Sequence, residues 1–591
     1  MKTEHVWRYA LLGTLLSVLA MFIMGQVVRI QLDRERVQLF IDRGKDYLYL
    51  PRTIYPARGL IYDRLGHLLA GNTTVYEVAA DLPYVENPHT VALTLNVTLG
   101  LDYKKVLAEL DPDRKDGIVH PVLTDFVPQE KINQIERYRE EIEKNYGDSK
   151  KKDAPSLDGL VYTQHLQRTY PENDLASNIL GFVGRDTDGR IIGYFGVEAK
   201  YNDLLAGEPK TVMIPMDPNR VAEMPEVPDG ASLVLTIDRQ IQDAMEEVVD
   251  QTLESSGAES VTIVVEDPKT GDILAMATTP RLNLNQYWRY GEVFKGETPF
   301  NRAISQAYEP GSVFKVLTMA AGLDSKAVAP ETTFVDTGVF EIGGTYIYNW
   351  NSGAWGPQDM QGCMQHSLNV CLAWIATQIG AKQFYEYMDA FGIGRQTGIE
   401  MAGEASGRLK IPGDEDWYDA DLGTNAFGQG VSATPLQMAA AISAIANDGK
   451  MMAPRIVRSI IKDGHQYDTG ERLVGMPISA ETARTLSEML ARSLELEASD
   501  ALVEGYRVAG KTGTAEIPTP YGYTSNVTNA SFVGWGPMPD NRFLVYIWLE
   551  KPTTSIWGSE VAAPVFAEVV ERLVVLMNIP PDDVRNALLS Q

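Results

Sequence analysis

A serine and a lysine three residues apart form the first arrangement in this chain that could do chemistry. Ser312-Val313-Phe314-Lys315 follows the turn-forming string Tyr308-Glu309-Pro310-Gly311 and precedes an apolar run. The serine is therefore predicted to lie where a helix begins. Because positions i and i+3 share one helical face, the Lys315 amine can approach the Ser312 hydroxyl. A lysine that is shielded from water and close to other cations can be neutral enough to accept the serine proton.

Two other Ser-x-x-Lys strings show that this motif alone carries little information. Ser149-Lys150-Lys151-Lys152 lies in a charged loop. Ser459-Ile460-Ile461-Lys462 lies in a strand-like run, where positions i and i+3 point to opposite faces. Only the string at residue 312 has the context of a helix start.

Two further polar motifs follow along the chain. Ser367-Leu368-Asn369 offers a hydroxyl that could relay a proton to a leaving amine and an amide that could hold a substrate carbonyl. Lys511-Thr512-Gly513-Thr514 follows Val508-Ala509-Gly510, and glycine in a strand permits close approach of a ligand backbone. The lysine and threonines there could bind a terminal carboxylate. Lys269-Thr270-Gly271 also matches, but a hairpin turn between two apolar runs explains it.

The helices and strands that position these groups belong to a chain of 591 residues. A chain of this length is too long for one hydrophobic core, so we expect two or more domains. Tyr9 to Val28 carries no charge and is long enough to cross a bilayer as a helix. No convincing cleavage site follows it, so we expect an uncleaved anchor. Apolar residues at helical spacing predict a surface helix over Gln129 to Tyr146.

Beyond Pro228, strand-like apolar runs alternate with helical stretches, which indicates an α/β domain. Phe543 to Leu549 is predicted to be a buried strand, and Ala563 to Met577 a helix with Pro564 in its first turn. Tyr348, Trp350 and Trp355 cluster in a glycine-containing loop, where they either line a peptide groove or pack against the domain.

Composition excludes several functions. A net charge of -27 argues against a nucleic-acid partner, because binding phosphates needs clustered Lys and Arg. The seven histidines fall in no metal or triad pattern, and no Gly-x-Ser-x-Gly elbow occurs, so we expect no metal, no cofactor and no histidine-dependent hydrolase. The two cysteines, Cys363 and Cys371, lie eight apart in a stretch that reads as helix. Such residues are about 12 Å apart, too far for a disulfide, so we expect buried thiols.

The ordered set of Ser-x-x-Lys, Ser-x-Asn and Lys-Thr-Gly motifs is the one found in class A β-lactamases and penicillin-binding proteins. The chain resembles class B penicillin-binding proteins over nearly its whole length. Strings that resemble that family's motifs are Arg58-Gly59-Leu60-Ile61-Tyr62-Asp63-Arg64, Arg168-Thr169-Tyr170-Pro171, Gly196-Val197-Glu198, Asp267-Pro268-Lys269-Thr270-Gly271, Gly428-Gln429-Gly430 and Thr434-Pro435-Leu436-Gln437. Leu368 departs from the aspartate in one common version of the second motif.

The resemblance implies an α/β penicillin-binding transpeptidase fold, in which helices flank an antiparallel sheet. An elongated α+β pedestal and one N-terminal transmembrane helix precede it. The expected domains are a short cytoplasmic tail (1–8), the transmembrane anchor (9–30), the pedestal or dimerisation-like domain (31–227) and the transpeptidase domain (228–591). The last two would lie outside the bacterial cytoplasmic membrane.

The resemblance also implies a peptidoglycan D,D-transpeptidase that acts on stem peptides ending in D-Ala-D-Ala and is inhibited by β-lactam antibiotics. Ser312 would be the nucleophile, with Lys315 as its base. Ser367 and Asn369 would assist proton transfer and positioning. The substrate carboxylate would be bound by Lys511, Thr512, Gly513 and Thr514. The backbone N–H groups of Ser312 and Thr514 would form the oxyanion hole. A SEDS-family glycosyltransferase is the expected partner, through the transmembrane helix and the pedestal.

Three alternative functions stay open at this point. A D,D-carboxypeptidase or a β-lactam sensor would share the fold, but the long pedestal between residues 50 and 227 disfavours both. A non-catalytic scaffold that activates a SEDS glycosyltransferase is disfavoured by the intact Ser312 and Lys315. The motifs serve cell elongation, septal division and spore-wall synthesis equally.

Overall fold

The fold comes from a computed structural model, which describes residues 6–33, 37–38, 49–112, 117–147, 154–187, 190–215, 227–295, 298–497, 499–519 and 522–589. The chain divides into two compact units. One unit comprises residues 1–57 and 207–230, and the other comprises residues 58–206 and 231–591. The Ser-x-x-Lys string at residue 149 lies outside the described residues.

The smaller unit contains the N-terminal helix and a two-stranded sheet. Helix α1 (Val6–Leu32) includes the apolar stretch Val6–Ile30, which is long and apolar enough to cross a membrane. The uncharged segment from Tyr9 to Val28 lies within it. Strand β1 (Tyr49–Ile54) pairs antiparallel with β8 (Lys210–Pro215), so the two chain segments of this unit meet in one ribbon.

One mixed sheet of the larger unit joins strands from both sides of residue 228. Its order is β18-β17-β9-β2-β3-β4, with β5 paired to β3. The strands are β2 (Ile61–Tyr62), β3 (Leu68–Ala80), β4 (Val122–Pro128), β5 (Leu160–Thr169), β9 (Ser232–Leu235), β17 (Val457–Lys462) and β18 (His465–Asp468). Helices α3 (Pro88–Leu99), α4 (Tyr103–Glu109) and α5 (Gln129–Tyr146) pack at the far end of β3. Helix α5 confirms the helix predicted over the same residues.

A buried ion cluster ties together three of the strings that the sequence singled out. The Glu198 carboxylate is fully buried, and it accepts hydrogen bonds at 2.7 Å from Arg58 Nε and at 2.7 Å from Arg168 Nε. Tyr170 also donates its hydroxyl to Glu198, at 3.4 Å. Since a buried carboxylate is stable only when its oxygens are paired, these motifs are explained by the assembly of this part of the fold.

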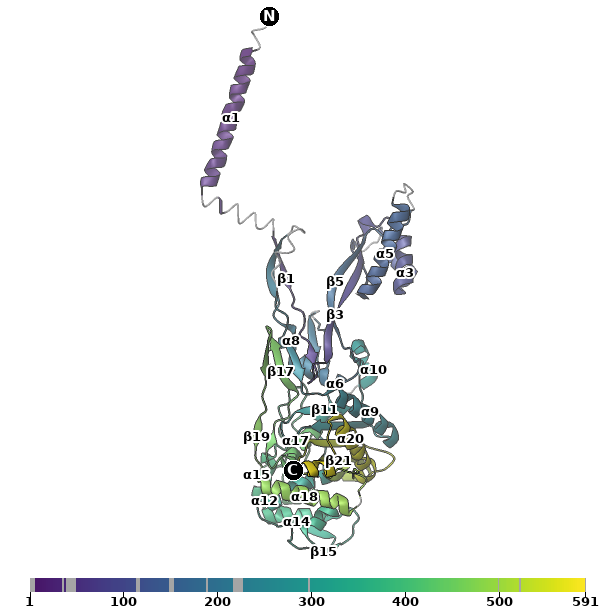
Figure 1. The fold of residues 1–591 in the computed structure, drawn as a ribbon, viewed down its shortest axis with the longest axis vertical. Helices are drawn as coiled ribbons and strands as arrows, with labels where there is room; N and C mark the ends of the chain where they lie inside the picture. Colours follow the sequence, from purple (N-terminus) through teal and green to yellow (C-terminus); the bar gives the residue numbers. More distant parts are fainter. Residues whose placement is uncertain are drawn as a thin grey trace. The chain divides into compact units, whose positions relative to one another are not determined.

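The second sheet carries the Lys511-Thr512-Gly513-Thr514 motif on one of its edge strands. Its order is β11-β10-β22-β21-β20, antiparallel throughout. The strands are β10 (Ser260–Glu266), β11 (Ile273–Thr278), β20 (Ala509–Thr519), β21 (Gly522–Gly536) and β22 (Phe543–Glu550). Helices α9 (Arg239–Ser256) and α20 (Ala563–Leu576) cover one face, and α12 (Lys315–Asp324), α17 (Pro435–Ala446) and α18 (Ala480–Leu496) lie in the core on the other (Figure 1). The predicted α/β pattern, strand β22 and helix α20 are confirmed.

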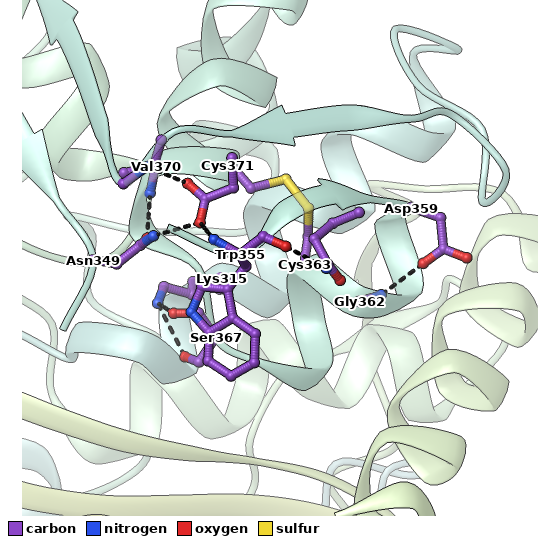
Figure 2. The surroundings of a disulfide bond; sticks show 12 residues. Lys315, Asn349, Trp355, Asp359, Gly362, Cys363, Ser367, Val370 and Cys371 are labelled. Carbon is purple, nitrogen blue, oxygen red and sulfur yellow. Dashed lines mark hydrogen bonds between the residues drawn. A yellow bond between two sulfur atoms is a disulfide. The ribbon is translucent and has the colours of Figure 1, made fainter. Parts of the chain in front are cut away.

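The prediction of two separate thiols is wrong, because Cys363 and Cys371 form a disulfide with a Cα–Cα distance of 6.0 Å. The stretch that carries them is two helices, α13 (Met360–Gln365) and α14 (Asn369–Ile379). Between them Ser367 adopts the left-handed region with φ of 52°. The chain therefore turns back within three residues and brings together two side chains that a straight helix would separate (Figure 2).

Replacing both cysteines by alanine should lower the free energy of unfolding by about 2–3 kcal/mol, because the unfolded chain regains the freedom of a short closed loop. Urea unfolding of the double variant checks this. The matched comparison is the wild-type protein unfolded with a reductant present, which should lose a similar amount. Equal unfolding midpoints for the variant and the oxidised wild type would contradict the expectation.

Glu266 should make the stability of the protein depend on pH. Its carboxyl is fully buried, no cation forms an ion pair with it in the described part of the chain, and burial raises its pKa from 4.5 to about 8. The folded state thus prefers the protonated acid, and that preference is lost as the pH rises from about 4.5 through about 8. Between these values the wild type should lose roughly 1.4 kcal/mol per pH unit at most relative to Glu266→Gln. Denaturant midpoints of both proteins across this range provide the test, and parallel pH curves would count against it.

Candidate active site

Ser312 lies in the turn that opens helix α12, as the sequence predicts. The turn is a 3₁₀ helix, η4 (Gly311–Phe314), and α12 continues directly from it at Lys315. Ser312 is partly exposed, whereas Lys315 is fully buried. Gly311 has φ of 58°, and a Cβ atom there would lie 2.7 Å from the carbonyl oxygen of Thr514. The absence of a side chain at Gly311 therefore allows the serine turn to pack against strand β20.

Lys315 joins the first motif to the second. Its Nζ donates hydrogen bonds to the carbonyl oxygen of Ser367 at 2.7 Å and to Ser367 Oγ at 3.0 Å (Figure 2). No carboxylate forms an ion pair with this amine among the described residues. Burial, and next the positive charge of Lys511, lower the pKa of Lys315 well below its ordinary value. The amine is therefore suited to accept a proton.

The Ser367-Leu368-Asn369 motif occupies the break between α13 and α14. Leu368 is fully buried in the main core, so the position that varies in this motif serves here as an apolar anchor. Asn369 donates its side-chain amide to the carbonyl oxygen of Tyr348 at 3.0 Å. The Cys363–Cys371 disulfide spans the break, so the motif is held covalently as well as by packing.

A buried polar pair supports the same turn: Asp336 ends strand β12 (Phe334–Asp336), and Asn349 directly follows strand β14 (Thr345–Tyr348). Asn349 accepts a hydrogen bond from the Val370 backbone N–H at 3.2 Å and donates to Asp336 Oδ2 at 2.8 Å. Both side chains are at least 97% buried. Sequence analysis did not identify this pair, because an isolated Asp or Asn is most often interpreted as a turn residue.

The third motif lies on β20, an edge strand of the five-stranded sheet β11-β10-β22-β21-β20. Lys511 and Gly513 are buried, while Thr512 and Thr514 are partly exposed on the opposite face of the strand. A Cβ atom at Gly513 would lie 2.2 Å from Ser531 Oγ and 2.9 Å from Val313, so only glycine fits between the sheet and the serine turn. Burial lowers the pKa of Lys511 to about 8.

The remaining matches to these motifs take no part in this arrangement. Lys269-Thr270-Gly271 is a turn between β10 and β11, as predicted, and Ser459 begins its Ser-x-x-Lys string inside β17. Of the aromatic side chains that the sequence placed near the site, Trp355 stacks on His366 with ring centroids 4.0 Å apart. Trp350 stays 53% exposed and contacts Trp557, which the sequence analysis missed.

Comparison with known proteins matches both halves of the chain. Residues 261–571 match the model of the penicillin binding protein transpeptidase domain, and residues 53–228 match that of the penicillin-binding protein dimerisation domain. Stage V sporulation protein D of Bacillus subtilis is 30% identical over 544 residues, which cover 89% of this chain and 79% of that protein. Peptidoglycan D,D-transpeptidase FtsI of Escherichia coli is 26% identical over 599 residues, covering 98% and 94%.

Solved structures show the same fold. The crystal structure of penicillin-binding protein 2X from Streptococcus thermophilus aligns with a TM-score of 0.75 at 24% identity and covers 89% of this chain and 80% of that one. Penicillin-binding protein 3 from Mycobacterium tuberculosis, complexed with ampicillin, aligns with a TM-score of 0.67 at 25% identity, covering 90% and 97%. Because the family model spans more than half of the sequence and the catalytic motifs meet in one site, the chain belongs to the penicillin-binding proteins that combine a dimerisation domain with a transpeptidase domain.

Proposed function

We propose that this protein is a peptidoglycan D,D-transpeptidase, in which Ser312 is acylated by a stem peptide ending in D-Ala-D-Ala and the acyl group passes to the amine of a second strand. The observation that carries the proposal is the buried Lys315 amine. It contacts Ser367 and has no carboxylate partner in the described part of the chain. A base of this kind can activate a serine at neutral pH without a histidine.

Acylation follows from the three motifs. Neutral Lys315 accepts the proton of Ser312, whose Oγ attacks the carbonyl carbon of the penultimate D-alanine. Backbone N–H groups of Ser312 and Thr514 stabilise the oxyanion, an effect worth about 10²- to 10³-fold in rate for each donor. The C–N bond to the terminal D-alanine then breaks, and its nitrogen receives a proton through Ser367.

The substrate is recognised by the Lys511-Thr512-Gly513-Thr514 motif and by the side-chain amide of Asn369. The terminal D-alanine presents a carboxylate, which Lys511, Thr512 and Thr514 bind across Gly513. Asn369 holds the donor peptide. β-Lactams also carry a carboxylate beside a reactive amide carbonyl, so they enter the same acylation step and leave a stable acyl-enzyme. The site residues require neither a metal ion nor an organic cofactor for these steps.

We also infer an extracytoplasmic location for the catalytic domain. Helix α1 is suited to anchor the chain in the cytoplasmic membrane. The Cys363–Cys371 disulfide favours an oxidising compartment over the cytoplasm, where thiols are kept reduced. In this arrangement residues 1–8 are cytoplasmic, 9–30 span the membrane, and 31–227 and 228–591 form the pedestal and transpeptidase domains. A SEDS-family glycosyltransferase would contact the anchor and the pedestal.

Replacing Ser312 by alanine should abolish covalent labelling by a fluorescent penicillin, because the variant lacks the hydroxyl oxygen that would form the ester with the opened β-lactam. The matched control is Ser459→Ala, which removes the serine of the Ser-x-x-Lys string in β17 and should label like the wild type. Intact mass and peptide mapping of the penicillin-treated proteins provide the readout. Labelling of the Ser312→Ala variant would refute the nucleophile assignment.

The wild-type reaction should be followed on polymerised lipid II with a labelled D-amino acid. Cross-links or D-amino acid exchange, together with a penicilloyl adduct on Ser312, are expected of a transpeptidase. An adduct with release of D-alanine alone would identify a carboxypeptidase. The absence of any adduct would favour the scaffold function.

The rate of acylation by penicillin should show a bell-shaped dependence on pH. The rate rises as Lys315 becomes neutral, and it falls near pH 8, where Lys511 loses the charge that attracts the penicillin carboxylate. Lys511→Arg keeps its charge at every pH in this range, so its falling limb should move to higher pH. Stopped-flow measurement of the second-order rate constant tests this. A falling limb at the same pH in both proteins would exclude Lys511 as its source.

A further inference from the structure

A carboxylate at the edge of the site has no role in the steps above. Glu309 lies three residues before Ser312, and its Oε1 accepts a hydrogen bond from the backbone N–H of Gly430 at 3.1 Å. Tyr523 donates its hydroxyl to Glu309 Oε2 at 3.1 Å. The carboxylate is thus held by two segments that are distant in sequence, the loop around Gly430 and strand β21.

Strand register places this carboxylate beside the outer part of the β20–β21 hairpin. Tyr523 pairs with Pro518, and cross-strand partners share a face of a sheet. Pro518 lies farther along β20 than Thr512 and Thr514, beyond a register shift between Glu516 and Ile517. Glu309 meets Tyr523 there, farther along the hairpin than the threonines. The proposed carboxylate-binding residues and Glu309 therefore occupy successive positions along one hairpin.

Charge differs between the two ends of this region. The inner end holds two buried lysines, Lys315 and Lys511. At the outer end, Glu309 forms no ion pair with any described residue, and its neighbour Lys410 is already paired with Asp421 at 2.7 Å. Burial raises the pKa of Glu309, which means that desolvation of the carboxylate is not offset within the chain. A cation from a ligand would offset it, whereas a second carboxylate would be repelled.

The chemistry of the reaction says which ligand brings a cation. The bond that the acceptor amine forms has the same geometry as the bond that the leaving D-alanine breaks, so the acceptor enters over the face of β20 that binds that D-alanine. In water at neutral pH an aliphatic amine is mostly an ammonium ion. An acceptor strand therefore arrives with a positive charge on the side where Glu309 lies.

We propose that Glu309, oriented by Tyr523 and Gly430, binds the ammonium group of the acceptor peptide and thereby sets the preference of the acyl-enzyme for a cationic amine. The bound ammonium gives one proton to water, and the neutral amine then attacks the acyl carbon. As the bond from that carbon to Ser312 Oγ breaks, the second proton passes from the amine through Lys315 to Ser312 Oγ. This inference rests on the proposed transpeptidase function. It makes Glu309 a specificity-determining residue for the second half of the reaction.

The test compares how the acyl-enzyme divides between an amine and water. The full chain in detergent is given a D-Ala-D-Ala donor peptide, with either a peptide bearing a free side-chain ammonium or hydroxylamine, which is neutral near pH 7. Glu309→Gln keeps an oxygen for both hydrogen bonds but loses the charge. Its aminolysis-to-hydrolysis ratio should fall about 10- to 100-fold for the ammonium peptide and stay at the wild-type value for hydroxylamine. Because the ratio is set after acylation, a change in acylation rate does not affect it.

Two variants separate charge from structure. Tyr523→Phe removes the hydroxyl but keeps the carboxylate, so the preference for the ammonium peptide should persist. Glu415→Gln removes an exposed carboxylate elsewhere in the domain and should leave both ratios unchanged. For the wild type itself, added salt should lower the ratio with the ammonium peptide only, which tests the inference even if Glu309→Gln folds poorly.

Three results would overturn the inference. If the aminolysis-to-hydrolysis ratio of Glu309→Gln equals that of the wild type, the charge of Glu309 does not recruit the acceptor. This result would leave the transpeptidase function intact. An equal loss in Tyr523→Phe would show that Glu309 only holds the hairpin in place. A wild-type enzyme that forms the acyl-enzyme but transfers it to neither amine would refute the proposed function, and this inference with it.

Discussion

The arrangement of the site depends on keeping one lysine amine buried without a counterion. Lys315 lies on a helix whose first eight residues are all buried, so its amine can leave the core only toward Ser367. There it finds a carbonyl and a hydroxyl rather than a carboxylate. A carboxylate would hold the proton on the amine, whereas neutral acceptors together with the nearby Lys511 charge favour its loss. The core around α12 therefore serves the chemistry as much as the stability of the fold.

The acceptor that Lys315 meets must itself be held still. Ser367 adopts a left-handed backbone conformation that costs on the order of 1 kcal/mol for a residue with a side chain. The disulfide, the buried Leu368 and the hydrogen bond from Val370 to Asn349 fix the chain on either side of it. Several independent restraints thus converge on three residues, which is the pattern expected where a strained turn positions a functional group.

Much of this could be predicted from the sequence, because it is local. Helix α5, strand β22, helix α20 and the start of α12 follow from apolar spacing and turn residues. The break in the helix between Cys363 and Cys371 could not be predicted, since no glycine or proline marks it and Ser367 is the residue that takes the unusual conformation. The separation of two cysteines along an ideal helix therefore gave the wrong distance. Glu309 was missed for a related reason, because its string was interpreted only as a turn and its partners come from distant segments.

Glycines on facing segments determine how closely the motifs approach each other. Gly311 packs under the Thr514 carbonyl, Gly513 packs under Val313, and a Cβ atom at Gly428 would lie 2.3 Å from the Gly311 carbonyl oxygen. A side chain at Gly311 or Gly513 would push the serine turn away from β20 and widen the gap between the nucleophile and the carboxylate-binding residues. A side chain at Gly428 would collide with the backbone of the same turn. The same close packing places Glu309 beside Gly430, one turn before the nucleophile. Cationic and anionic groups consequently lie near the serine turn and β20, although the chain as a whole carries a net charge of -27. Local backbone packing, rather than overall charge, therefore decides where an ionic substrate can bind.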